Sequence, residues 1–234
     1  MKIKGKEYCK WIDENYLMVG KSYFYKGEFE DAIKTFSFIK NEYKKNEIQF
    51  DASLWLIRAL VEKQDFMTAE VELNELTNNR KFPKKLNIDL AKISADFYLQ
   101  QANYPLALEQ LVKIDKLIKR KSKKVRYNYI MAQLYQQHTN YRSAKNKYEQ
   151  VLASSPEYEM VFNAKMNLAR LLDSGSRDTQ KMRQNLLKMT KDDKNKEYLD
   201  QIYFTLAEMD INNSDTLAAI DNYLLSTVNS LENN

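Results

Sequence analysis

The sequence has few of the residues that interrupt helices or build catalytic and metal sites. Its 234 residues include one cysteine, one histidine, three prolines and four glycines. A single cysteine excludes an internal disulfide, and one cysteine with one histidine is too few for a zinc site of the usual ligand set. The four glycines stand apart, so no glycine-rich phosphate loop is present. We therefore expect no enzyme activity and no cofactor, and the scarcity of helix breakers favours helix along nearly the whole chain.

Long apolar runs are also missing. No stretch approaches the roughly 18–20 apolar residues that a membrane-spanning helix needs. Residues 1–6 are basic, but no apolar stretch follows them, so they do not form a signal peptide, and Cys9 lacks the preceding apolar residues of a lipoprotein cysteine. The expectation is either a cytosolic protein or a piece of a longer chain. The net charge of +5 is modest, and we expect no nucleic acid partner.

A repeat with a nearly constant period runs through the chain. An aromatic residue followed three positions later by alanine occurs at Phe29/Ala32, Phe66/Ala69, Tyr104/Ala107 and Tyr141/Ala144. These alanines are 37, 38 and 37 residues apart, and two further steps reach Lys181 and Ala219. The sequence thus predicts six units. The fifth is degraded, because Lys181 replaces the alanine and Ser174-Gly175-Ser176 interrupts it, and we expect it to be weakly coupled to the rest.

Each unit has the pattern of two packed helices. A small residue commonly lies twelve positions before the alanine, and a bulky residue lies four positions after it, as in Gly20, Ala32 and Phe36. Spacings of three, four and seven residues define one helix face. A small residue lets two helices approach closely, and the bulky side chains fill the space around it. Neither helix can bury its face alone, so the units must stack.

The predicted fold is all-α, a right-handed solenoid of about six helix-turn-helix repeats. Residues 1–12 would be an N-terminal extension or the end of a preceding helix, and residues 13–234 the solenoid. Gly27, Asn103 and Asn140 fall in turns within pairs, and Pro83 and Pro156 fall between units. The repeats are expected at about 13–46, 47–84, 85–122, 123–156, 157–194 and 195–234.

The repeat resembles the tetratricopeptide family, whose pattern is W-x2-L-G-x2-Y, then A-x3-F, then P. The first unit has Tyr16-x2-Val19-Gly20-x2-Tyr23 followed by Ala32-x3-Phe36. The resemblance implies a protein-binding scaffold whose groove is lined by the first helix of each pair. The implied groove residues are Leu17, Lys21, Phe24, Leu54, Arg58, Lys92, Asp96, Tyr129, Gln133, Met166, Arg170, Phe204 and Glu208. The alternative is that several of them simply pack between neighbouring helices.

A basic run lies at the turn between the third and fourth units. Its residues are Lys119, Arg120, Lys121, Lys123, Lys124 and Arg126. A solvated connector is the plainest interpretation of this candidate basic patch. An acidic protein surface, anionic lipid or nucleic acid are the alternatives.

Two segments resemble a narrower group, the tetratricopeptide lipoproteins of gliding motility and type IX secretion in Bacteroidota. They are residues 13–25 continuing to 32–36, and residues 191–203, which include Asn195-Lys196-Glu197-Tyr198-Leu199-Asp200-Gln201-Ile202-Tyr203. The resemblance implies a periplasmic scaffold at the outer membrane whose protein partners are secretion or motility components. Its contact with the membrane would be through an anchor absent from this chain. The alternative is a cytosolic adaptor that binds a peptide or helix of an unknown partner.

Overall fold

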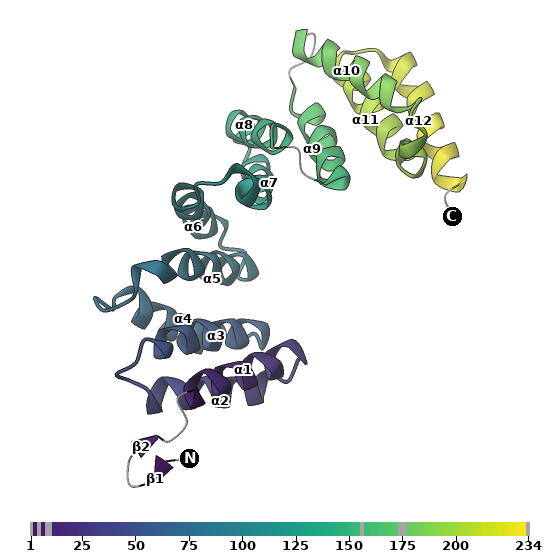
Figure 1. The fold of residues 1–234 in the computed structure, drawn as a ribbon. Helices are drawn as coiled ribbons and strands as arrows, with labels where there is room; N and C mark the ends of the chain where they lie inside the picture. The colour runs from purple at the N-terminus through teal and green to yellow at the C-terminus, as the bar shows by residue number, and fades with distance from the viewer. Residues whose placement is uncertain (1, 4–5, 8–10, 155–156, 173–176, 233–234) are drawn as a thin grey trace. The chain divides into compact units, whose positions relative to one another are not determined.

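The computed structural model describes residues 2–3, 6–7, 11–154, 157–172 and 177–232 (Figure 1). Pro156 and the interrupting segment 174–176 lie outside the described residues, as does Cys9. The chain divides between Lys119 and Arg120 into two compact units, each of which holds three helix pairs.

Unit 1 begins with a short antiparallel hairpin. Its strands β1 (Lys2–Ile3) and β2 (Lys6–Glu7) pair Lys2 with Glu7 and Ile3 with Lys6. A short 3-10 turn, η1 (Lys84–Leu86), precedes the third pair. The three pairs are α1 (Ile12–Tyr25) with α2 (Phe29–Glu42), α3 (Ile48–Glu62) with α4 (Phe66–Thr77), and α5 (Asn87–Gln100) with α6 (Tyr104–Leu117).

Unit 2 repeats the arrangement. A 3-10 segment, η2 (Asp193–Tyr198), leads into its last pair. The pairs are α7 (Lys121–Gln137) with α8 (Tyr141–Leu152), α9 (Tyr158–Arg170) with α10 (Arg177–Met189), and α11 (Leu199–Asn212) with α12 (Thr216–Glu232).

The predicted helix-turn-helix architecture is confirmed, and the hairpin lies within the predicted N-terminal extension. The largest boundary difference is at the sixth repeat, expected from residue 195, because α11 begins at Leu199. The side chain of Asn195 is fully buried and donates to the Met189 carbonyl at 2.7 Å. This bond holds residues 193–198 in a 3-10 turn ahead of the helix.

The turn inside five of the pairs has the same backbone form. One residue adopts a positive φ, as at Gly27 and Thr139, and the N–H that follows bonds back to the carbonyl five positions earlier. Asn103 and Asn140, placed in these turns by the sequence, then cap the second helix by accepting from the backbone N–H groups of Leu106 and Ser143. Glycine occupies the positive-φ position only once; the other residues there are Gln64, Ala102, Thr139 and Ser214.

The repeat positions supply the core. The key alanines at positions 32, 69, 107, 144 and 219 are all fully buried, and so are Phe36 and Tyr148. At the fifth repeat Lys181 is exposed, and α10 buries only Thr179 and Leu186 among its described side chains. The helix that lacks the packing alanine therefore contributes least to the core.

Candidate protein-binding surface

The first helices carry one chemically variable position directly after the small residue of each repeat, a place that Ile57 takes in the second repeat. In unit 1 this position is Lys21, Arg58 and Asp96, and in unit 2 it is Gln133, Arg170 and Glu208. None of these six residues is buried. Because the first helices α1, α3 and α5 stack on one another, the unit 1 side chains lie along one surface, and the same holds for α9 and α11 in unit 2.

Unit 1 brings two of these cations onto aromatic rings. The Arg58 guanidinium lies 4.2 Å from the centre of the Trp55 ring and 5.0 Å from that of Phe24. The Lys21 ammonium lies 5.1 Å from the same Trp55 ring, and the exposed Tyr25 contacts Trp55 edge to face at 5.8 Å. We call Lys21, Phe24, Tyr25, Trp55 and Arg58 the aromatic–cation cluster. Cation–π contacts hold both charged groups in place while leaving them partly open to solvent.

Acidic groups border the cluster. Burial raises the pKa of Asp51, and the nearby cations Lys21 and Lys85 partly offset that shift. Desolvation of its carboxylate raises the pKa of Asp96 although the residue as a whole is exposed, and Arg58 opposes this shift. The surface thus runs from two cations on α1 and α3 to a carboxylate on α5.

Unit 2 has a related but more fully paired surface. Arg170 Nε donates to Glu208 Oε2 at 2.6 Å, and its guanidinium lies 5.8 Å from the centre of the Phe204 ring. Asn167 Nδ2 donates to the Tyr129 hydroxyl at 3.2 Å. Because Arg170 already has a carboxylate partner, an incoming acidic group has less to gain here than at Arg58.

Four of the thirteen predicted groove residues are buried in the structure. Leu17, Phe24, Leu54 and Met166 are each no more than 9% exposed. They lie three positions before or four positions after the small residue, where the side chain is directed into the contact between helices rather than to the surface. They therefore support the surface by packing, as the alternative interpretation of these positions expects. Lys92 is half-buried and pairs with Asp89 on its own helix at 3.1 Å.

Trp55 and Tyr25 were missed by the sequence analysis. Trp55 follows the predicted Leu54 by one position, and only the packing shows that its ring turns toward α1. The available signal was composition: tryptophan occurs only twice in this chain, and it is enriched at binding surfaces.

The basic run stays at the surface. Lys119 and Arg120 precede α7, and Lys121, Lys123 and Arg126 in its first turns are exposed, whereas Lys124 is half-buried. The first turn of α7 contains no acidic residue. Cations at a helix N-terminus oppose the helix dipole, so this arrangement costs helix stability rather than adding to it.

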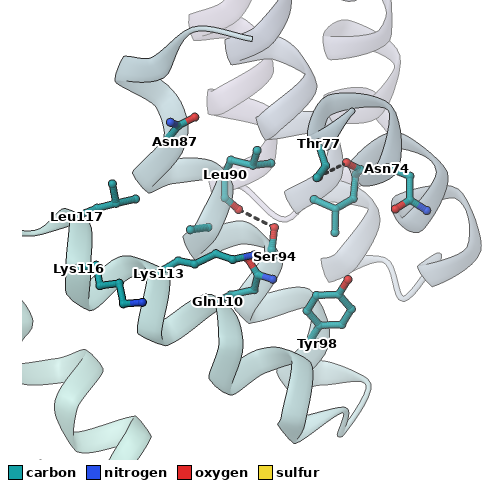
Figure 2. A pocket seen from close by; sticks show the side chains of 12 residues that line it. Asn74, Thr77, Asn87, Leu90, Ser94, Tyr98, Gln110, Lys113, Lys116 and Leu117 are labelled. Carbon is teal, nitrogen blue, oxygen red and sulfur yellow. Dashed lines mark hydrogen bonds between the residues drawn. The ribbon is translucent and has the colours of Figure 1, made fainter. Parts of the chain in front are cut away.

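A pocket of about 400 Å³ opens between α4, α5 and α6 (Figure 2). Leu73, Leu90 and Ala91 form its apolar lining, and Lys113 and Lys116 come from α6. Figure 2 shows the Ser94 hydroxyl directed at the Leu90 carbonyl, to which it donates at 2.8 Å. Since Ser94 is satisfied by its own helix, it is not poised for chemistry.

The described helices show no membrane span, and the described acidic and histidine side chains form no metal site. No described helix is long and apolar enough to cross a membrane. Within the same residues, no three or more such side chains cluster as metal ligands.

No protein-family model matches the chain, and no curated protein matches it in sequence. Solved structures do match. A tetratricopeptide repeat protein from Parabacteroides merdae aligns with a TM-score of 0.61 at 15% identity, over 90% of this chain and 77% of that one. BtubC from P. vanneervenii aligns with a TM-score of 0.57 at 14% identity, over 94% and 92%. The apo form of RapI aligns with a TM-score of 0.56 at 12% identity, over 98% and 86%. The chain therefore has a tetratricopeptide-type fold.

Proposed function

We propose that this chain is a non-catalytic scaffold that binds an extended, acidic segment of a partner protein at the aromatic–cation cluster of unit 1. The observation that carries the proposal is the placement of Lys21 and Arg58 against the ring of one partly exposed tryptophan, Trp55. Neither cation has a carboxylate partner within ion-pair distance among the described residues. A partner carboxylate would complete both.

The energetic argument rests on preorganisation. Trp55 is braced by Phe24 at 5.4 Å and by Phe36 at 6.1 Å, so its ring does not have to be ordered on binding. Arginine and tryptophan are the side chains that most often dominate binding energy at protein interfaces. A carboxylate placed between Lys21 and Arg58 would gain charge-assisted hydrogen bonds beside an apolar ring, where water screens it less than on an open surface.

Charge reversal tests whether the partner binds at the aromatic–cation cluster. Arg58→Glu and Lys21→Glu should each weaken recovery of the partner from cells that make the native protein, and raising the salt concentration should weaken wild-type binding. The matched control is Lys113→Glu with Lys116→Glu, which reverses two exposed cations on α6, outside the aromatic–cation cluster. Equal loss in the control would show that net charge, and not the cluster, governs binding.

We further propose that the partners are components of a gliding or type IX secretion apparatus, and that the chain works on the periplasmic side of the outer membrane as part of a longer lipoprotein. Residues 13–25 with 32–36, and residues 191–203, support this proposal by their resemblance to the lipoproteins of that system. In the second segment, Asn195 is buried and Tyr198 packs on Phe162 at 4.6 Å, so part of the resemblance reflects packing. Gln201 is exposed, and the packing gives no reason for its side chain.

The cellular test is fractionation followed by complementation. The native protein should appear in the outer-membrane fraction, and a deletion strain should lose secretion or gliding. Wild type should restore that function, and the Trp55→Ala, Arg58→Glu variant should not. An unlipidated cytosolic protein would contradict this assignment and favour the cytosolic adaptor. The proposal that a partner binds at the aromatic–cation cluster would remain, because charge reversal tests it separately.

A further inference from the structure

The pocket between α4, α5 and α6 lies where the second and third repeats of unit 1 meet (Figure 2). Its volume of about 400 Å³ falls in the range of small-molecule sites. Its apolar wall is aliphatic, with Leu73 from α4, Leu90 and Ala91 from α5, and Leu117 from α6. None of its lining residues belongs to the aromatic–cation cluster. A ligand held here is therefore separate from the protein partner proposed above.

A charged bridge occupies the equivalent place between the first and second repeats. There the Lys40 ammonium of α2 bonds the carboxylates of Glu72 and Glu75 on α4 at 2.7 Å each. The repeat period of 37 and then 38 residues places three other residues at the equivalent positions of the next contact, and all three line the pocket: Thr77, Gln110 and Lys113. Thr77 is short and uncharged, and its hydroxyl donates to the Leu73 carbonyl of its own helix at 2.8 Å. The bridge therefore cannot form in the second contact.

The same exchange leaves the pocket with a positive edge. Lys113 is paired within α6, with Glu109 at 3.0 Å and with the side-chain oxygen of Gln110 at 3.4 Å (Figure 2). Lys116 is exposed and has no ion-pair partner among the described residues. None of the described residues that line the pocket is acidic. An aliphatic wall beside two ammonium groups is complementary to a molecule with an apolar body and an anionic head.

We propose that this pocket binds a small amphipathic carboxylate, with its alkyl chain against the leucines and its carboxylate at Lys113 and Lys116. Contact with the aliphatic wall removes the alkyl chain from water, which is the main source of affinity. The two lysines select an anion over a cation. Lys116 gains a partner without giving one up, whereas at Lys113 the carboxylate competes with an exposed ion pair that contributes little.

Calorimetric titration of the full chain with decanoate, kept below its micelle concentration, tests the class of ligand. Decanoate should bind at a single site. Acetate has the head without the chain, and decyltrimethylammonium has the chain with the opposite charge, so neither should bind detectably. No binding of decanoate, or equal binding of decyltrimethylammonium, overturns the proposal. Binding of a peptide that ends in a free leucine carboxylate, without binding of decanoate, would assign the pocket to a protein terminus and overturn it as well.

Charge removal tests the place of binding. Lys113→Gln with Lys116→Gln should weaken decanoate binding about fivefold, the effect of one exposed ion pair. The matched control is Lys44→Gln with Lys45→Gln, which removes the same charge from two exposed residues that do not line the pocket. The control should bind decanoate as wild type does. An equal loss in both variants would show that net charge governs binding, and would overturn the assignment to this pocket.

A further variant rebuilds the bridge of the first contact inside the pocket. Thr77→Lys with Gln110→Glu and Lys113→Glu gives α4 the cation and α6 the two carboxylates, and it lowers the net charge by two, as the glutamine variants do. It should abolish decanoate binding while helix content and melting temperature stay at least at the wild-type values. A folded rebuilt variant that binds decanoate as tightly as wild type overturns the proposal. The glutamine pair tests the same pocket if the rebuilt chain does not fold.

Discussion

Gly20 in α1 leaves the space that the Phe36 ring of α2 fills: a Cβ at position 20 would lie 2.5 Å from Phe36 Cε1. The contact explains why a small residue recurs twelve positions before most of the key alanines, with Ile57 as the exception in the second repeat. Gly20→Ala would crowd the ring at a cost of about 1–3 kcal/mol, while the helix itself gains at most ~1 kcal/mol from the loss of glycine. We expect a net loss of stability of unit 1 in urea unfolding.

The control is Met18→Ala on the same helix, where the side chain is exposed and the change should be nearly neutral. Gly20→Ala combined with Phe36→Leu should recover part of the loss, since the smaller side chain frees the space. A single Gly20→Ala variant as stable as wild type would mean that the ring moves aside at no cost.

Thr139 adopts a φ of 57°, in the left-handed region that β-branched residues disfavour. Glycine takes this position in the first repeat, at Gly27. Thr139→Gly should therefore raise the free energy of unfolding of unit 2 by up to about 1 kcal/mol. Gln137→Gly, placed two residues earlier within α7, should lower it by about as much. A loss of stability in both variants would contradict backbone strain at Thr139.

Tyr148 gives unit 2 a dependence on alkaline pH. Its side chain is fully buried, and its hydroxyl donates to Gln136 Oε1 at 2.9 Å. Burial, reinforced by the neighbouring Tyr129, raises the pKa of Tyr148 above the usual value of about 10. The folded state therefore holds this proton more tightly than the unfolded state, so its contribution to stability is complete below pH ~10 and declines above it.

The comparison is thermal unfolding of wild type and Tyr148→Phe between neutral and strongly alkaline pH. The variant should be less stable near neutrality, because it loses the bond to Gln136, and the difference should shrink above pH ~10. A constant difference across the series would show that Tyr148 does not ionise on unfolding.

The fifth repeat should open more readily than its neighbours. The helix α10 buries few side chains, which makes it easy to open. Arg183 is what ties it to α11, because its guanidinium donates to the buried Asp210 carboxylate at 3.0 and 3.4 Å. Amide exchange in 177–189 should be faster than in 127–150, and Arg183→Ala should speed it further. Lys181→Ala, an exposed change on the same helix, should not. Equal protection of the two ranges would contradict the prediction.

The periodic pattern predicted the helix pairs because each pair repeats one packing solution, seen at Gly20 and Phe36. It could not predict which groove residues are exposed. Leu54 and Trp55 are adjacent in sequence, yet Leu54 is buried and the Trp55 ring makes cation–π contacts with Lys21 and Arg58. A helix turns by about 100° per residue, so this choice depends on where α1 crosses α3, which local sequence does not specify.

The sequence also did not predict which charged residues form ion pairs. Arg170 and Glu208 lie 38 residues apart, one repeat period, and nothing in the local sequence of either predicts their 2.6 Å contact. Their pairing in unit 2, against the unpaired cations on Trp55 in unit 1, is what makes the two surfaces different. Because of this difference, we propose that the partner binds at unit 1.

Photo-crosslinking in living cells tests that placement most directly. A crosslinking side chain at Arg58 and one at Tyr129 would report on the surfaces of units 1 and 2, and one at the exposed Val71 of α4 would measure background. We predict partner adducts from position 58, fewer from position 129, and none above background from position 71. Adducts from position 71 or 129 with none from position 58 would contradict binding at the aromatic–cation cluster.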